Sequence, residues 1–298
     1  MTSPLPRAAW SIDVLARATE PRFCDGSPSD AHQDDCERIR ISFDIGSAAE
    51  PVLSPDAQQA FRAEFYRELA SIRAWWAKEA WTPVSIRSLQ ISVSYNYRIS
   101  RALVPAWEGQ QGRMEFPAHR VAEGKAAILH ELTHVFFPNG NRLLAEGLAI
   151  HLQQLIGGNP AFPNFGRPLH EVAREVLEDI VPEFGPADPT SLKSLHLTEL
   201  DRIATPNPLA LRVGLDVYGE EPRGQGRLYP IAGSFVQFLI DNHGLGKFRD
   251  LYARTPLAPS QLSGGTPSRW HGVYGRPLDA FEAEWKSLIC TNAGVGNA

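Results

Sequence analysis

The sequence predicts an α+β protein in which a mixed sheet comes first and a mainly helical part follows. Alternating apolar and polar residues, typical of strands, lie before residue 117, whereas apolar residues after residue 154 keep helical spacing. An apolar helix predicted at residues 126–137 lies between the two parts. We therefore expect a sheet-containing subdomain at residues 1–140 and a helical subdomain at residues 141–298.

A strand, a long helix and a second strand are predicted at the start of the sheet-containing part. Residues 39–45 alternate in hydropathy and predict the first strand. Ser54 followed by Pro55 is typical of a helix start, because serine caps a helix and proline suits its first position. Helical spacing then continues to about residue 80, and residues 89–97 alternate as the second strand.

A β-hairpin is predicted next, with strands at residues 102–107 and 113–116 around a glycine-containing turn. The order of strand, helix, strand and hairpin favours a mixed sheet covered by one long helix. The apolar helix at residues 126–137 follows the hairpin directly.

This apolar helix carries the HExxH motif, His130 to His134. Residues four apart lie on one face of a helix, so His130 and His134 can reach a single ion. Two neutral imidazoles suit Zn²⁺, and the adjacent Glu131 carboxylate suits deprotonation of a zinc-bound water. The alternative is a pair of core histidines, each of which would need a buried polar partner.

A third ligand is expected because catalytic zinc sites usually have three protein ligands and one water. A Pro- and Gly-containing turn at residues 137–141 ends the motif helix, and residues 143–150 predict another. Glu146 is the acidic residue of this apolar stretch, and a buried carboxylate requires a partner such as a metal. His151 and Asp201 are the rival candidates for the third ligand.

The HELTH sequence followed by a helix containing AEGLA resembles the gluzincins, zinc peptidases of the peptidase MA-like superfamily that include thermolysin. The resemblance implies a zincin (thermolysin-like) fold with the active-site helix between the two subdomains. It also implies one zinc ion held by His130, His134 and Glu146. The segments around residues 229–244 and 275–285 resemble later helices of that superfamily, so the likeness extends over residues 85–290.

Two features distinguish the chain from familiar zincins. The pattern HExxHxxGxxH is absent, because Phe137 and Gly140 occupy its glycine and third histidine positions. The aspartate that follows the ligand glutamate by one turn in thermolysin is replaced by Ile150, so another residue must orient the ligands.

In the thermolysin-like fold an antiparallel edge strand pairs with extended substrate. The hairpin strand at residues 113–116 is our candidate, and an ordinary interior strand is the alternative.

The function implied is a zinc-dependent metallopeptidase acting on a peptide or protein substrate through a zinc-bound water. Glu131 is the expected general base, and Tyr229 is a candidate donor to the developing oxyanion. His243 is a weaker candidate for that role, because residues 242–244 are typical of a helix C-terminus. The alternatives are a non-catalytic zincin-fold binding module and a zinc hydrolase of a non-peptide amide. No motif specifies cleavage preference or oligomeric state.

The helical part is predicted to contain helices at residues 170–180, 229–242, 245–253 and 278–290. Between them lie two long loops, residues 157–168 and 204–227, which are rich in proline and glycine. Long loops in compact domains are often functional, so both are candidates to line a cleft.

Composition narrows the possible partners and surroundings. The 298 residues are 43% hydrophobic, with a net charge of −5 and no basic stripe that would favour nucleic acid. No apolar run is long enough for a membrane span, and the N-terminus lacks a signal-peptide core. We expect a soluble protein, cytoplasmic as written, or periplasmic or secreted if a leader has been removed. Cys24 and Cys36 either form a disulfide or remain free, and Cys290 is left over.

Overall fold

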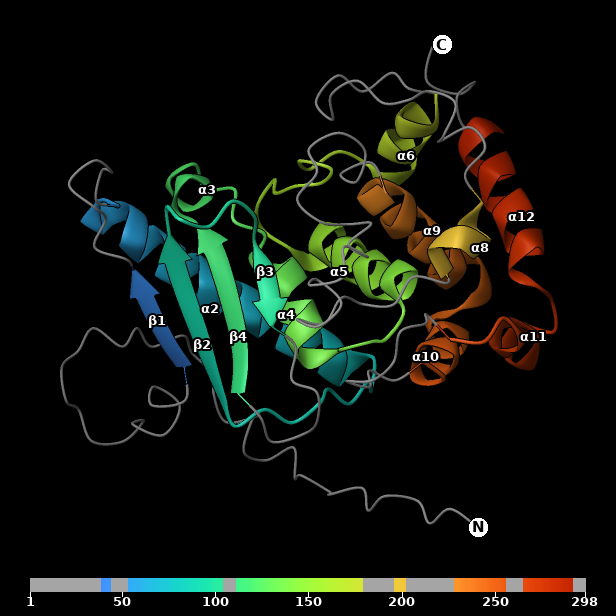
Figure 1. Cartoon of the computed structure of the whole chain (residues 1–298), viewed down its shortest axis with the longest axis horizontal. Helices are drawn as coiled ribbons and strands as arrows, with labels where there is room; N and C mark the ends of the chain where they lie inside the picture. Colours follow the sequence, from blue (N-terminus) through green and yellow to red (C-terminus); the bar gives the residue numbers. More distant parts are fainter. Residues whose placement is uncertain are drawn as a thin grey trace.

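The structure is a computed structural model, and it describes residues 39–43, 53–103, 111–178, 196–201, 228–255 and 265–291. Cys24, Cys36 and the predicted loop at residues 204–227 lie outside the described residues. All strands of the described chain precede residue 118, and every described element after it is a helix. In Figure 1 the sheet and its long helix lie on one side, and the later helices lie on the other.

The sheet has four strands in the order β1-β2-β4-β3. Strands β1, β2 and β4 are parallel, whereas β3 pairs antiparallel with β4. The predicted hairpin is therefore confirmed where both of its strands are described. The strands span Ile39–Phe43 (β1), Ser88–Ser94 (β2), Arg101–Leu103 (β3) and Gln111–Pro117 (β4).

The prediction of residues 113–116 as an edge strand is wrong. These residues belong to β4, which pairs with β2 along its whole length, from Ser88↔Gln111 to Ser94↔Pro117. With its other side paired to β3, strand β4 is interior. The antiparallel edge of the sheet is therefore β3. A hairpin motif does not tell which of its strands joins the parallel part, because that depends on long-range register.

Strand β2 ends three residues earlier than the alternating pattern predicted. The hydroxyl of Ser94 accepts a hydrogen bond from the backbone N–H of Asn96 at 3.1 Å. Tyr95 and Asn96 lie in the resulting turn. A serine side chain that bonds two residues ahead stabilises a turn in competition with the strand ladder, and this interaction overrides the hydropathy pattern.

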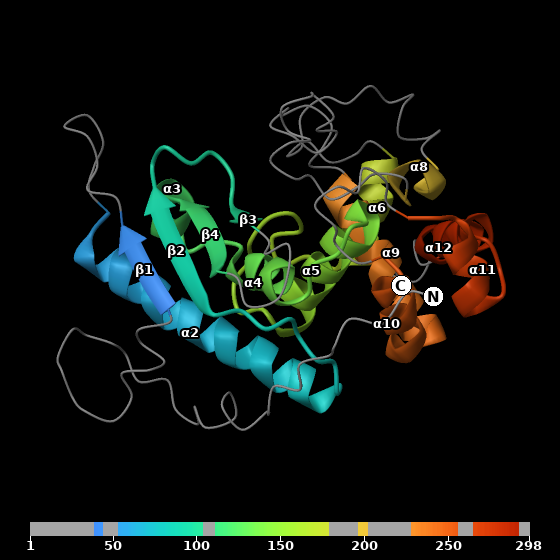
Figure 2. The same ribbon diagram turned by 60° about the horizontal axis from the view of Figure 1, so that its bottom comes forward.

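Helix α2 (Pro55–Lys78) covers one face of the sheet, as Figure 2 shows. Its N-terminus is capped as predicted, because the Ser54 hydroxyl accepts a hydrogen bond from the backbone of Ala57. The Phe61 ring packs edge-on against Phe43 of β1 and Phe116 of β4. This aromatic contact joins the two parallel strands at either side of β2 to one helix.

The motif helix, α4 (Ile128–Phe136), lies beside the sheet, and its close approach depends on a glycine. A Cβ at Gly112 of β4 would lie 2.9 Å from Val135 Cγ1 of α4. The next residue of the helix, Phe136, packs against Trp76 of α2 with ring centroids 4.9 Å apart. Apolar packing on two sides therefore holds α4 against both the sheet and α2.

The helical part contains the four helices predicted from sequence, namely α6 (Leu169–Leu177), α9 (Leu228–His243), α10 (Leu245–Ala253) and α12 (Leu278–Thr291). The short helices α3 (Ala118–Ala122), α8 (Leu197–Asp201) and α11 (Ser268–Tyr274) were not predicted. Five to seven residues make at most two turns, too few for a clear periodic pattern. Within the described ranges, no helix combines the length and hydropathy needed to cross a membrane.

Helices α5 (Arg142–Ile156) and α9 cross at two glycines. A Cβ at Gly147 of α5 would lie 2.3 Å from Val236 Cγ2 and 2.7 Å from the carbonyl oxygen of Ala232. At Gly233 of α9, a Cβ would lie 2.5 Å from Ile150 Cγ2. Each helix thus presents a bare backbone to the other. Neither contact could be seen in the sequence, because it requires knowing which helices meet.

Gly147→Ala should destabilise the protein by about 1–3 kcal/mol, because the new methyl group meets a backbone carbonyl that cannot move alone. This loss should exceed the gain in helix propensity of up to about 1 kcal/mol. Gly246→Ala is the matched control, since a Cβ at Gly246 of α10 meets nothing within 4 Å. Urea denaturation of both variants tests the packing. Equal stability of the two variants would contradict it.

Glu68 of α2 is a buried acidic residue close to the start of α4. Glu68 is only 2% exposed, and its Oε1 accepts a hydrogen bond from the backbone of Gly158 at 2.9 Å. Burial raises the pKa of Glu68 to about 7, while hydrogen bonds from the backbones of Gly158 and Leu129 lower it. Leu129 lies in the first turn of α4, whose own N-cap, Ala127, has no side-chain acceptor. Glu68 therefore lies close to a helix start that has no side-chain cap of its own.

Stability should depend on pH through Glu68. The folded protein binds a proton there more tightly than the unfolded chain, so its free energy of unfolding falls as pH rises from 4.5 towards about 7. In the Glu68→Gln variant this side chain cannot ionise, so the variant does not lose free energy of unfolding through this group as pH rises. The stability of the wild type relative to the variant should drop by about 1–3 kcal/mol between pH 4.5 and 8. Urea denaturation at both pH values measures it, and a constant difference would refute the assignment.

Candidate metal centre

Helix α4 places the two motif histidines one above the other. Their ring centroids are 4.7 Å apart, and the Nε2 atoms of His130 and His134 are 3.1 Å apart. Both rings are largely buried, with side-chain exposures of 10% and 12%. The expected arrangement of an i, i+4 pair on one helical face is therefore present.

Glu146 of α5 completes a triangle of ligand atoms. Its Oε2 lies 3.1 Å from Nε2 of His130 and 3.2 Å from Nε2 of His134. Among the described residues, His130, His134 and Glu146 form a group of potential metal ligands. Their ligand atoms all lie within 4.8 Å of one another. The short turn at residues 137–141 makes α4 and α5 neighbours, and so brings together ligands twelve residues apart.

The triangle fits a tetrahedral zinc ion. In such a site, ligand atoms about 2.0 Å from the metal lie about 3.3 Å from one another, close to the 3.1–3.2 Å seen here. Two imidazole nitrogens and one carboxylate oxygen are also a common donor set for zinc. Burial raises the pKa of Glu146, but Arg142 and the two imidazoles more than offset this and hold it well below its usual range. The carboxyl group is therefore an anion, as a metal ligand must be.

Arg142 is a site residue that the sequence interpretation missed. Its Nε lies 3.1 Å from Oε1 of Glu146, and its guanidinium donates a hydrogen bond to the hydroxyl of Tyr229 at 2.9 Å. By holding Oε1, it leaves Oε2 directed at the imidazoles. The signal was present in the sequence, because Arg142 precedes Glu146 by four residues on one helix. Ile150, in place of the thermolysin-type aspartate, packs on Gly233 instead.

Glu131 lies next to His130 and is 4% exposed. Burial raises the pKa of Glu131 to about 7, and the nearby Glu146 carboxylate adds to this increase. His130, Arg142 and a hydrogen bond from the backbone of Ala102 act in the opposite direction. Ala102 belongs to β3, so the edge strand lies close to the acidic residue of the motif.

Tyr229 lies at the site although it comes from α9. Its ring centroid is 6.3 Å from that of His130, and its hydroxyl accepts the hydrogen bond from Arg142. Burial raises the pKa of Tyr229, so the phenol stays protonated and can serve as a donor. Phe162 packs edge-on against it at 5.5 Å, which places part of the predicted loop at residues 157–168 beside the centre.

Three residues considered for the site lie elsewhere. His151 is buried near Asp241 and His170, and burial lowers its pKa to about 4. Asp201 accepts hydrogen bonds from Asn141 and Trp270 and is not part of the ligand group. His243 ends α9, is followed by Gly244 at φ +87°, and contacts Glu284 at 3.7 Å. Cys290 is exposed and free.

Comparison with known proteins gives no relative. No protein-family model matches this chain, and neither a curated protein nor a solved structure matches it. Support for a function therefore comes from the chemistry of the residues that meet at the candidate centre.

Replacing Arg142 should weaken zinc binding. Arg142→Met removes the cation paired with Oε1 of Glu146, and the affinity for zinc should fall about 10- to 100-fold. Arg142→Lys keeps the positive charge but loses the planar guanidinium. Its affinity for zinc should therefore lie between those of the wild type and of Arg142→Met. Arg167→Met is the control, because Arg167 pairs with Glu171 and Glu175 on a surface helix. Competition with a chromophoric chelator measures the affinities, and equal values for Arg142→Met and wild type would exclude this role.

Proposed function

We propose that the protein is a zinc-dependent metallopeptidase similar to the gluzincins. The observation that carries this proposal is the meeting of His130, His134 and Glu146 side-chain atoms within 3.1–3.2 Å. A buried glutamate, Glu131, lies on the same helix beside them. One zinc ion is the cofactor that this donor set suits.

Glu131 is proposed as the general base. When bound, zinc supplies Lewis acidity that lowers the pKa of water and polarises a carbonyl group. Glu131 takes a proton from the attacking water and returns it to the leaving amine. A carboxyl group with a pKa near 7 suits both steps, because it can gain and lose a proton near neutral pH.

Arg142 and Tyr229 are proposed to act on charge that develops in the reaction. Tyr229 donates a hydrogen bond to the oxyanion formed from the scissile carbonyl. Arg142, which donates to the Tyr229 hydroxyl at 2.9 Å, fixes the position of that donor. The same guanidinium orients Glu146, so one cation serves both the ligand and the oxyanion donor.

Strand β3 is proposed as the site that receives an extended peptide. It is the antiparallel edge of the sheet, and among the described residues it pairs with β4 alone. It also lies next to α4, as Figure 1 shows. A peptide added to this edge by strand pairing would run past the motif helix. This assignment replaces the one made for residues 113–116, which are interior.

Glu131→Gln should keep zinc and lose nearly all hydrolysis, because the amide cannot accept the proton from water. The test compares zinc content and cleavage of a general peptide library for wild type and variant. Glu171→Gln, an exposed change on α6, is the matched control and should cleave like the wild type. Near wild-type turnover by Glu131→Gln would remove this residue from the mechanism.

The same experiment separates the alternatives. A wild-type protein that binds zinc and cleaves no peptide would favour a non-catalytic binding module or a hydrolase of a non-peptide amide. A wild-type protein that binds no zinc would exclude the metallopeptidase. Cleavage that is lost on chelation and restored by zinc supports the proposal.

A further inference from the structure

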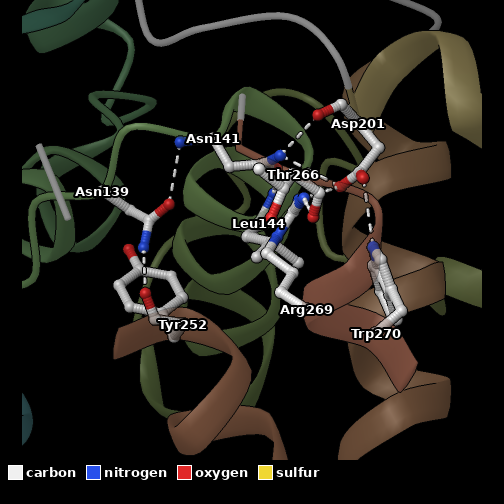
Figure 3. A network of polar contacts seen from close by, with 8 residues as sticks. All are labelled: Asn139, Asn141, Leu144, Asp201, Tyr252, Thr266, Arg269 and Trp270. Atoms are coloured by element: carbon white, nitrogen blue, oxygen red, sulfur yellow. Dashed lines mark hydrogen bonds and ion pairs between the residues drawn. The ribbon is translucent and has the colours of Figure 1, made fainter. Parts of the chain in front are cut away.

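The turn between α4 and α5 joins the helices that carry the zinc ligands, and a buried polar network holds it (Figure 3). This network connects the turn to α8, α10 and α11, which come 60 or more residues later in the chain. None of these contacts involves an atom of the ligand triangle. Each one acts on the chain that separates His134 from Glu146.

Helix α10 holds the first half of the turn. The amide of Asn139 donates to the backbone oxygen of Tyr252 at 2.7 Å and accepts from the backbone of Asn141 at 2.8 Å. The backbone of Gly140 donates to the backbone oxygen of Thr255 at 3.1 Å. The Tyr252 hydroxyl donates to the backbone oxygen of Phe137 at 2.5 Å. The turn is thus bonded through Phe137, Asn139 and Gly140 to Tyr252, near the end of α10, and to Thr255, just after it.

Asn141 connects the second half of the turn to α8. It is the N-cap of α5, where its Oδ1 accepts from the backbone of Leu144 at 2.9 Å. Its Nδ2 donates to the backbone oxygen of Asp201 at 2.8 Å and to the Asp201 carboxylate at 3.0 Å. One amide therefore defines both where α5 begins and where that start lies relative to α8.

Asp201 is held in turn by α11. Arg269 forms an ion pair with Oδ1 of Asp201, and the Trp270 indole donates to Oδ2 at 3.0 Å. Asp201 and Arg269 are each 4% exposed, and Asn141 is fully buried. Burial raises the pKa of Asp201, which the bonds from Arg269, Trp270 and Asn141 oppose. A buried pair of this kind tolerates little displacement, because either charge alone would be desolvated.

We infer that Asp201 is a positioning residue for the metal centre, acting through Asn141 on the placement of Glu146. The inference rests on the proposed zinc site. Glu146 follows the cap by five residues, and a slip of one residue at the start of α5 would turn it about 100° away from the imidazoles. Its Oε2 has to lie within 3.2 Å of two nitrogens at once. The buried ion pair therefore preorganises a ligand that it does not touch.

The test measures zinc affinity of the full chain with the metal alone, by competition with a chromophoric chelator, together with the melting temperature. Asn141→Ser keeps an N-cap oxygen but is too short to bridge to Asp201, and Asp201→Asn removes the charge. Both should lower zinc affinity at least about tenfold. If Asp201→Asn does not fold, Asn141→Ser decides, because it leaves the Asp201–Arg269 pair intact.

Ser234→Ala is the matched control. The Ser234 hydroxyl is buried and bonded to Trp285 and His170 at 2.8 Å, in a cluster with no bond to the turn. This variant should melt at a lower temperature and bind zinc like the wild type. Weakened binding in Asn141→Ser but not in Ser234→Ala supports the inference. Unchanged affinity in a folded Asn141→Ser, or equal weakening in Ser234→Ala, would overturn it and leave the metal centre intact. A wild type without zinc affinity would overturn both.

Discussion

A carboxylate removed from water has to be charge-compensated, and the centre of this structure is organised around that need at Glu146. Two imidazoles contact one of its oxygens, and the Arg142 guanidinium contacts the other. With one oxygen held by a fixed cation, the other is available to a divalent ion together with the histidine nitrogens. Burial makes each of these interactions stronger than it would be in water, and it makes any misplacement costly.

Elements far apart in sequence supply the conditions for this centre. Glu68 of α2 lies close to the start of the helix that carries the histidines, and the turn after that helix is bonded to α8 and α10. Close contact at Gly147 and Gly233 lets α9 pack on α5, and α9 begins at the site with Tyr229. The sheet contributes β3, whose backbone lies close to Glu131. Contacts between elements that are distant in sequence therefore position the side chains of the candidate metal centre.

Much of the secondary structure was predictable, because long elements repeat their hydropathy over several turns. Helices α2, α9, α10 and α12 and strands β1 and β4 lie close to where the pattern predicted them. Errors occurred where a local or long-range interaction overrides the pattern. The Ser94 hydroxyl ends β2 early, and short helices such as α8 have too few residues to show a period. The edge strand is β3 rather than β4, because β4 pairs in parallel with β2 and this pairing depends on the tertiary structure.

The sequence by itself determined that His130 and His134 share a face and that Glu131 lies beside them, because the geometry of one helix specifies these relations. It also singled out Glu146 as a buried acid. Only the tertiary structure decided that Glu146 meets both rings, that Asp201 and His151 do not, and that Arg142 and Tyr229 are linked to it. Local periodicity gives the direction of a side chain from its own helix. Which neighbour it meets depends on how α4, α5 and α9 pack, and that is set by contacts between residues distant in the chain.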